Sequence, residues 1–404
     1  DATKSVTDLG LGLTQVLGVG TVALISHAVG RKDQDDANLL FNQSLLLSFI
    51  CLGITLIGGY GLGGAYLASV GADAATTREG LTYLHWYLPG LALQFALVAM
   101  GSALRGTGIV KPTMVVQVLT LLINIVLAPV LIAGWGTGYA LGVAGAGLAS
   151  SLSVAAGVVM MWVYFVRMEH YVSFRASQLR PRIETWKRML AIGFPAGAEF
   201  ALMFVFMAVI YSVIAPFGAA AQAGFGIGGR VMQAIFLPAM AIAFATPAIA
   251  GQNFGARNPQ RVRETFRVAA LMSSAVMFLL TLLCHWQPGW MISRFTDEAE
   301  VIAVGTVFLQ LISLNFVAQG IIFTCSGMFQ ALGNTWPALL STAIRLLTFA
   351  LPVLWLSRRV DFRIEQVWYL SVATVALQAV ISFFLLRGQL RIRLAPLQAG
   401  GANS

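Results

Sequence analysis

The sequence predicts an all-α protein that crosses a membrane many times, and three observations favour that class. First, 58% of the 404 residues are hydrophobic and only 10% are charged, whereas roughly one quarter of the residues in a soluble domain are charged. Second, the mean hydropathy is +0.80. Third, the apolar runs are long and continuous, unlike the short alternating segments of a membrane β-barrel. A helix satisfies its own backbone hydrogen bonds in lipid, so helices are the expected element.

Gly, Pro and charged residues divide the apolar runs into eleven predicted helices. A bilayer core about 30 Å thick needs roughly 20 apolar residues per helix, and each run is long enough. In order, the predicted helices span 5–30, 36–64, 77–105, 110–134, 141–167, 188–215, 220–252, 262–286, 298–330, 336–357 and 365–387.

The stretch LRGTGIVKP at 104–112 ends the third helix, and it has a later copy. A shift of 225 residues places it on FQALGNTWP at 329–337, so that Gly108 coincides with Gly333 and Pro112 with Pro337. The same shift places Gly30 on Gly255 and Gln94 on Gln319 without a gap. These matches in turn residues and loop lengths indicate an internal duplication.

The duplication predicts how the chain is organised. Under the same shift, the counterpart of helix 188–215 would lie before residue 1, so we expect eleven of twelve membrane helices here, with the first absent. The twelve would form two pseudo-symmetric lobes of six helices. Because six is even, both lobes would have the same orientation in the membrane. The expected parts are an N-terminal lobe at 1–167, a cytoplasmic linker at 168–187, a C-terminal lobe at 188–390 and a cytoplasmic tail at 391–404.

Lysine and arginine residues predict the orientation, because they are in excess in cytoplasmic loops. Most of the 25 in this chain lie in one set of connections and at the C-terminal end, which also explains the net charge of +9 without a nucleic-acid partner. We therefore expect the following loops to be cytoplasmic: 31–36, 105–111, 168–187, 253–261 and 331–336.

Several segments together resemble the multidrug and toxic compound extrusion (MATE) transporters of the MOP flippase superfamily. The first are the repeated turns at 104–112 and 329–337. The others are HAVGRKDQDDA at 27–37 with its counterpart GQNFGARNPQRVR at 251–263, and GVAGAGLASSLS at 142–153. The resemblance covers essentially the entire chain. It implies a multi-pass antiporter of a bacterial inner membrane that exports organic, often cationic, compounds against inward H⁺ or Na⁺, by alternating access to a central cavity.

The resemblance also sets the expected partners. They are small organic substrates and membrane lipid, with a monomer as the expected state and no cofactor beyond the coupling ion, H⁺ or Na⁺. A flippase for lipid-linked oligosaccharide is the alternative within the superfamily, and it would be expected to have a strongly basic cavity. An enzyme is disfavoured because no nucleophile, base or metal-ligand motif occurs. The three scattered cysteines suggest neither a disulfide nor a metal site.

Ionisable residues inside the membrane are costly and therefore mark candidate sites. Glu199 lies about 17 Å beyond Arg188 along its helix, close to the bilayer midplane. A carboxylate at that depth is suited to reversible binding of a proton or cation, and a structural role is the alternative. Arg345 enters from the same side to a comparable depth, so it is the candidate partner of Glu199.

Four neutral polar residues complete the predicted set of coupling or cavity residues. Sodium-coupled members of the family carry a glutamate on the helix of Glu199 and an acid on the tenth helix, where this chain has Asn315 and Gln319. The first half contributes Gln94, the repeat partner of Gln319, and Asn124, about twelve residues past Pro112. Cavity lining and hydrogen bonding between helices are both open for these residues.

Overall fold

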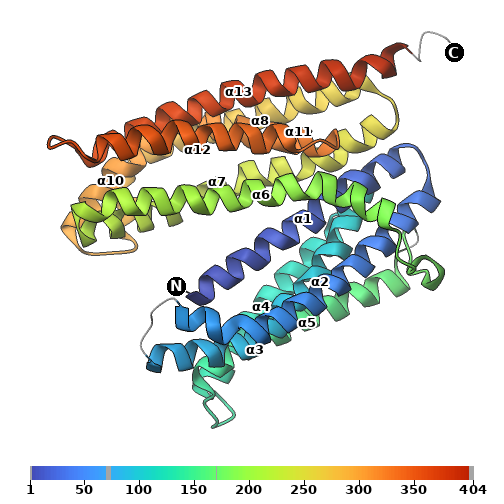
Figure 1. Cartoon of the computed structure of the whole chain (residues 1–404), viewed down its shortest axis with the longest axis horizontal. Coiled ribbons are helices and arrows are strands. Elements are labelled where there is room, and N and C mark those ends of the chain that lie inside the picture. The colour runs from blue at the N-terminus through green and yellow to red at the C-terminus, as the bar shows by residue number, and fades with distance from the viewer. Residues whose placement is uncertain (1, 70–73, 170, 400–404) are drawn as a thin grey trace. The chain divides into compact units, whose positions relative to one another are not determined.

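The computed structural model describes residues 2–69, 74–169 and 171–399, and all of their regular structure is helical (Figure 1). Eleven of the helical segments in this part of the chain are long and apolar enough to cross a membrane, which confirms the predicted class. The chain divides into two compact units, Asp1–Gly197 and Ala198–Ser404. Each unit is a bundle of long helices that run side by side (Figure 1).

The first unit contains five complete helices and the beginning of a sixth. They are α1 (Ala2–Gly30), α2 (Gln34–Ser69), α3 (Ala74–Thr107), α4 (Lys111–Ala133), α5 (Gly142–Arg167) and the first part of α6 (Ile183–Ile214), with a short 3₁₀ turn η1 (Ala176–Gln178) between the last two.

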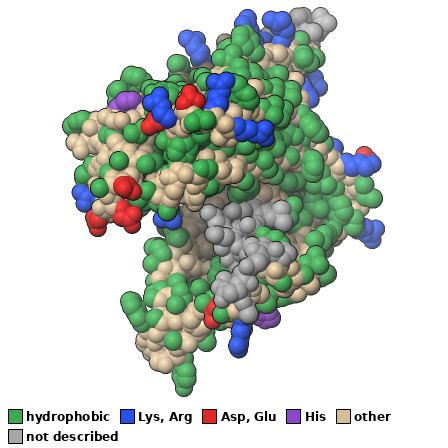
Figure 2. Space-filling view, turned by 60° about the vertical axis from the view of Figure 1, so that its left-hand side comes forward, with side chains coloured by type: hydrophobic (Ala, Val, Ile, Leu, Met, Phe, Trp, Pro, Cys, Tyr) green, Lys and Arg blue, Asp and Glu red, His purple; other side chains and the backbone are tan. Residues whose placement is uncertain are grey.

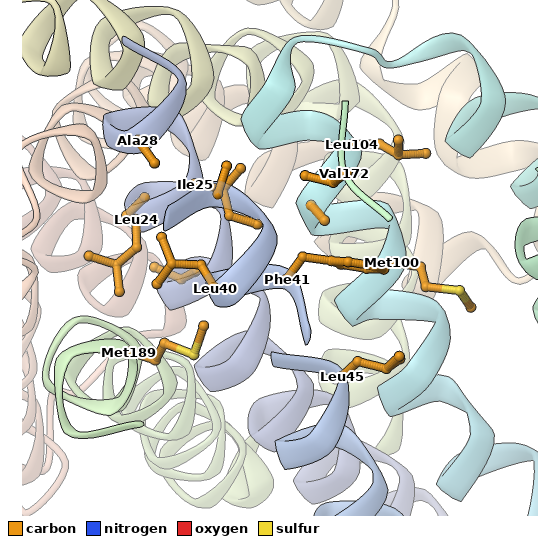
Figure 3. Close-up of a cluster of buried hydrophobic side chains, with 14 of the residues drawn as sticks. Leu24, Ile25, Ala28, Leu40, Phe41, Leu45, Met100, Leu104, Val172 and Met189 are labelled. Atoms are coloured by element: carbon orange, nitrogen blue, oxygen red, sulfur yellow. The ribbon is translucent and has the colours of Figure 1, made fainter. Parts of the chain in front are cut away.

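The core of the first unit is formed by apolar side chains from α1, α2, α3 and α6, several of which are labelled in Figure 3, and α5 adds Met161 and Phe165. Ile25 and Phe41 are fully buried there, and the ring of Phe41 stacks on that of Phe165 with centroids 4.7 Å apart. Val172, in the segment between α5 and α6, is fully buried in the same cluster.

The segment between α5 and α6 is attached to α2 by three buried amide side chains. Asn38 and Asn42 each donate to a carbonyl of this segment and accept a backbone N–H from it. Gln43 donates to the carbonyls of Gln178 and Arg180 and accepts from the Arg182 N–H. A segment without regular structure must satisfy its backbone groups in this way when it is buried. The connection predicted as a linker is thus held against the first unit as far as Arg182.

The second unit contains the remainder of α6 and the helices that follow. They are η2 (Ala215–Phe217), α7 (Ala219–Gly255), α8 (Pro259–Trp286), α9 (Pro288–Ser293), α10 (Ala299–Ile312), η3 (Ser313–Asn315), α11 (Phe316–Ala331), α12 (Trp336–Leu356) and α13 (Ile364–Ala399). Its largest core cluster is rich in aromatic side chains. Within it, the Trp368 ring lies parallel to Phe225 and edge-on to Phe308.

The turns that were matched in the sequence have the same backbone conformation in both units. Gly108 and Gly333 both have positive φ, 86° and 70°, and so do Lys32 (60°) and Arg257 (55°), which also differ by 225 residues. The hydrogen bonds repeat as well, since the N–H of Ile109 donates to the carbonyl of Leu104 as Asn334 does to Phe329. A left-handed residue that ends a helix in this way is the usual C-terminal cap. The repeat predicted from the sequence is therefore present in the structure of these turns.

The predicted helix at 298–330 is confirmed as one membrane span, Ala299–Ala331, but it contains a turn that was not predicted. The span is interrupted by η3, so that α10 ends at Ile312 and α11 begins at Phe316. The carbonyl of Ser313 accepts from the Phe316 N–H within this turn, and the Thr281 hydroxyl on α8 donates a second hydrogen bond to it at 3.0 Å. No Pro or Gly occurs at Ser313–Asn315, so no helix-breaking residue marks this turn.

The repeat-equivalent place in the first unit is Pro89, inside α3. Proline has no N–H and disturbs the hydrogen-bond ladder of a helix. There the hydroxyl of Ser151 on α5 accepts from the Gly90 N–H and donates to the carbonyl of Trp86, the two groups that would otherwise bond directly along α3. Each unit thus has a perturbed helix at the same point of the repeat, stabilised by a hydroxyl from a neighbouring helix.

The remaining predicted helices agree with the structure except at some ends. α13 continues to Ala399, beyond the predicted end at 387, and α6 begins at Ile183, before the predicted start at 188. Large apolar side chains are widely exposed, and Figure 2 shows hydrophobic side chains spread over the visible face, with Lys and Arg mainly toward its edges. A surface of this kind is suited to contact with lipid.

Candidate functional site

The site that the structure supports best surrounds Glu199, near the middle of α6 and within the second unit. Pro195 lies one turn earlier in the same helix, where it removes a backbone donor. The Glu199 side chain is half-buried. Its carboxylate therefore lies among neighbouring helices rather than on the fully exposed surface.

Two hydroxyl groups face the carboxylate from neighbouring helices. Ser326 on α11 donates to Oε2 at 3.5 Å, and Thr342 on α12 donates to Oε1 at 3.3 Å. Both contacts are long for hydrogen bonds to an ionised oxygen, which are normally below 3.0 Å. A carboxylate has about four acceptor positions. The two hydroxyl donors therefore leave some acceptor positions of the carboxylate available to a bound proton or cation.

Thr342 connects the carboxylate to a second polar group. Its hydroxyl accepts from the Gln378 Nε2 on α13 at 3.0 Å, so its own proton is free to point toward Glu199. The Gln378 side chain is buried, and its Oε1 accepts from Arg345 Nη1 at 3.4 Å. A continuous row of contacts thus runs from Glu199 through Thr342 and Gln378 to Arg345.

Arg345 does not form an ion pair with Glu199 in the part of the chain that the structure describes. Its guanidinium lies over the ring of Phe206 on α6, with 4.3 Å from Cζ to the ring centroid. Its buried Nε has no hydrogen-bond partner among the described residues. The direct partnership considered from the sequence is thus replaced by an indirect one, in which two neutral side chains separate the charges.

The other predicted residues of the second unit lie outside this row of contacts. Asn315 is buried in η3, at the break between α10 and α11. Gln319 is half-buried one turn later on α11. Among the described residues, Glu199 accepts hydrogen bonds only from Ser326 and Thr342, so neither amide supplies it with a donor.

Gln94 and Asn124 belong to the first unit. Gln94 is half-buried on α3. Asn124 is half-buried on α4, and its Nδ2 donates to the Ser150 hydroxyl on α5 at 3.4 Å. The structure therefore shows Asn124 in a hydrogen bond between helices, which was one of the two roles that the sequence left open.

Sequence reasoning missed the three residues that connect the site, Ser326, Thr342 and Gln378. A partial signal existed, since Thr342 is three residues before Arg345 and so shares its helix face. Gln378 is a polar residue in the middle of an apolar run, which is also a recognised mark of an intramembrane site. The described residues contain no cluster of side chains that could hold a structural metal ion.

Comparison with known proteins decides the family. The MatE family model matches residues 2–130 and 195–356, which is most of the chain. The chain belongs to the MatE family. The family is one of transporters, which places the protein among membrane transporters.

The relatives and solved structures that match this chain cover nearly all of its length. The multidrug export protein MepA of Staphylococcus aureus (strain MSSA476) is 27% identical over 401 residues, covering 96% of this chain and 86% of MepA. A solved outward-facing structure of a multidrug resistance MATE family transporter of the MOP superfamily has a TM-score of 0.89 at 23% identity, covering 98% of this chain and 87% of that one. A MOP superfamily transporter from Pyrococcus furiosus has a TM-score of 0.86 at 24% identity, covering 98% and 88%. The two structures show that the fold is shared.

Proposed function

We propose that this transporter exports amphipathic organic cations or other xenobiotics in exchange for H⁺ or Na⁺, and that Glu199 takes part in coupling. Family membership and the similarity to multidrug export proteins support export. The observation that carries the role of Glu199 is a carboxylate within a membrane-spanning helix that is contacted by two hydroxyls and has no ion pair among the described residues.

Binding of a proton or cation at Glu199 would change the hydrogen bonds that join three helices. Ionised, the carboxylate accepts from Ser326 on α11 and Thr342 on α12. When it is neutralised, it accepts these bonds less strongly, since hydrogen bonds to a charged group are roughly twice as strong as neutral ones. The packing of α6 against α11 and α12 would then depend on the coupling ion, as alternating access requires.

Arg345 gives this site a fixed positive charge at one end of the row. The Thr342 and Gln378 side chains keep that charge from neutralising Glu199 directly. We propose that Asn315, Gln319, Gln94 and Asn124 line the substrate path or brace it. We also propose that the protein acts as a monomer in the inner membrane, with the repeated turns and the 168–187 segment in the cytoplasm.

The flippase alternative has less support. It would call for a strongly basic cavity, whereas the row of contacts at this site carries one carboxylate, Glu199, and one guanidinium, Arg345. The relatives that cover nearly the whole chain are also named as multidrug export proteins.

Transport by Glu199→Gln tests the proposal. In inverted vesicles that contain the protein, a fluorescent organic cation should accumulate when a H⁺ or Na⁺ gradient is imposed. Each elementary charge that crosses 100 mV supplies about 2.3 kcal/mol, which is enough to drive export. Because glutamine cannot bind either ion as a carboxylate does, gradient-driven accumulation should fall by about tenfold or more.

Glu300→Gln is the matched control, since Glu300 is an exposed glutamate in the first turn of α10. It should transport like the unchanged protein. Separate H⁺ and Na⁺ gradients identify the coupling ion. Normal gradient-driven transport by Glu199→Gln would remove Glu199 from the mechanism.

A further inference from the structure

A second candidate site lies within the second unit, and no residue of α6, the helix of Glu199, lines it. Its role is separate from the proposed export function. It is an open groove of about 360 Å³ formed by α7, α8, α9 and the residues after α9. Its wall is mostly apolar and includes Pro238 and Leu280. Two arginines, Arg230 and Arg294, lie at its edge together with Trp290.

No carboxylate in the described part of the chain pairs with either arginine. Neither forms an ion pair or a side-chain hydrogen bond among the described residues, although Asp297 and Glu298 follow Arg294 in the chain. Arg294 lies over the Trp290 ring at 4.8 Å, which holds its guanidinium beside the groove. No acidic side chain lines the groove. The charge at this site is therefore positive and is available to an anion.

The position along α7 places the arginines at the level of lipid headgroups. Arg230 is 27 residues before Arg257, which is about 40 Å along a helix. That length matches a bilayer with its headgroup regions, roughly 40–45 Å. Arg230 therefore lies at the interface opposite the Arg257 turn. Trp290 beside it is typical of the aromatic side chains that mark this level.

The surroundings of the groove favour a lipid over a soluble anion. Leu237 on α7 and Leu279 on α8, adjacent in sequence to lining residues, are 62% and 65% exposed. The apolar wall extends about 12 Å along α7 from Arg230 to Pro238, into the depth of the acyl chains. A soluble phosphate would leave this apolar surface uncovered, whereas an acyl chain would cover it.

We infer that this groove binds an anionic phospholipid, with its phosphate held by Arg230 and Arg294 and an acyl chain against Pro238 and Leu280. Arginine is suited to phosphate because its planar fork of N–H donors matches two phosphate oxygens. The groove is smaller than a whole phospholipid. It therefore holds the headgroup region and the beginning of one chain, and the exposed leucines on α7 and α8 contact the rest.

Quenching of Trp290 fluorescence by brominated lipid tests the inference. The protein is reconstituted into phosphatidylcholine vesicles with increasing fractions of phosphatidylglycerol that carries bromine on its acyl chains. Because the chain has 9 tryptophans, the fluorescence of Trp290 is obtained as the difference between the unchanged protein and the Trp290→Phe variant. Brominated phosphatidylglycerol should quench this part at lower mole fractions than brominated phosphatidylcholine does.

In the double variant Arg230→Gln with Arg294→Gln, the preference for phosphatidylglycerol over phosphatidylcholine should fall by about tenfold. Each arginine near a membrane surface contributes measurably to binding of anionic lipid. Arg359→Gln is the matched control, because Arg359 also lies over a tryptophan, Trp355 at 3.9 Å, but is not among the residues that line this groove. It should keep the preference. Thermal unfolding of each variant shows that it is folded.

Three results would overturn the inference. They are equal quenching of Trp290 by the two lipids, an unchanged preference in the double variant, and an equal loss in Arg359→Gln. Relief of quenching by millimolar inorganic phosphate would indicate a soluble-anion site and would also overturn it. Transport by Glu199→Gln is independent of this measurement, so failure of one proposal does not decide the other.

Discussion

Lys32 and Arg257 have a backbone conformation that side chains other than glycine rarely adopt. Their φ angles are 60° and 55°, and each ends a long helix, α1 and α7 respectively. At the other repeated turn the same conformation is taken by glycines, Gly108 and Gly333. The left-handed region costs a residue with a Cβ roughly 1–2 kcal/mol. Glycine at either position would therefore remove this energetic cost.

Lys32→Gly should stabilise the protein. Relief of the left-handed conformation outweighs the greater freedom of glycine in the unfolded chain, which leaves a gain of roughly 0.5–1 kcal/mol. The Lys32 side chain is exposed and forms no ion pair among the described residues, so little is lost with it. Thermal unfolding in detergent measures the change. Lys32→Ala is the control and should show no gain, and equal stability of the Gly and Ala variants would contradict the explanation.

The sequence predicted the site only in part, because its residues come from several helices. The depth of Glu199 and of Arg345 follows from counting along one helix, and the structure brings both into one set of contacts. Which side chains separate them depends on how α6, α12 and α13 are rotated about their axes. Hydropathy does not determine that rotation when the helices are apolar on nearly all sides.

At the scale of helices, several glycines are needed for close approach and others are not. A Cβ on Gly145 or Gly147 of α5 would collide with backbone carbonyls of Leu131 and Tyr83. A Cβ on Gly229 of α7 would meet nothing within 4 Å. Both segments have the small residues that are typical of helix contacts in membranes. The sequence pattern alone therefore does not separate a contact from an open position.

Gly147→Ala and Gly229→Ala should have opposite effects. In the first, the added methyl group would lie 2.6 Å from the Tyr83 carbonyl oxygen, and backbone cannot move away as a side chain can. We expect a loss of roughly 1–3 kcal/mol from overpacking. In the second, the open position and the better helix propensity of alanine predict no loss and a gain of up to about 1 kcal/mol. Thermal unfolding midpoints of the two variants measure this, and equal midpoints would contradict the packing of α5 on α3.

The interrupted helices show which local features hydropathy leaves out. Pro89 was visible in the sequence, but the hydroxyl of Ser151 that bridges Gly90 and Trp86 was not. The break at Ser313–Asn315 has no breaker residue, and it is supported by Thr281 on another helix. Tertiary contacts decide such features, so single-sequence reasoning found the membrane span and missed the break within it.

The two units of the whole chain contain equivalent turns, and we propose that the duplicated helices have the same orientation in the membrane. The number of membrane-spanning helices was predictable because long apolar runs are a strong signal. The family was predicted from the resemblance of particular turns and segments, and the family match confirms it. The repeated turns have equivalent backbone conformations at Lys32 and Arg257 and at Gly108 and Gly333. Equivalent turns in two halves with the same orientation must face the same side of the membrane.

Labelling of single cysteines tests this claim most directly. In a variant without Cys51, Cys284 and Cys325, a cysteine replaces Lys111, its repeat partner Trp336 or, as the control, Arg363, all of them exposed positions. A maleimide that cannot cross the membrane should label positions 111 and 336 only in inverted vesicles, and position 363 only in intact cells. Labelling of positions 111 and 336 from opposite sides of the membrane would contradict the account.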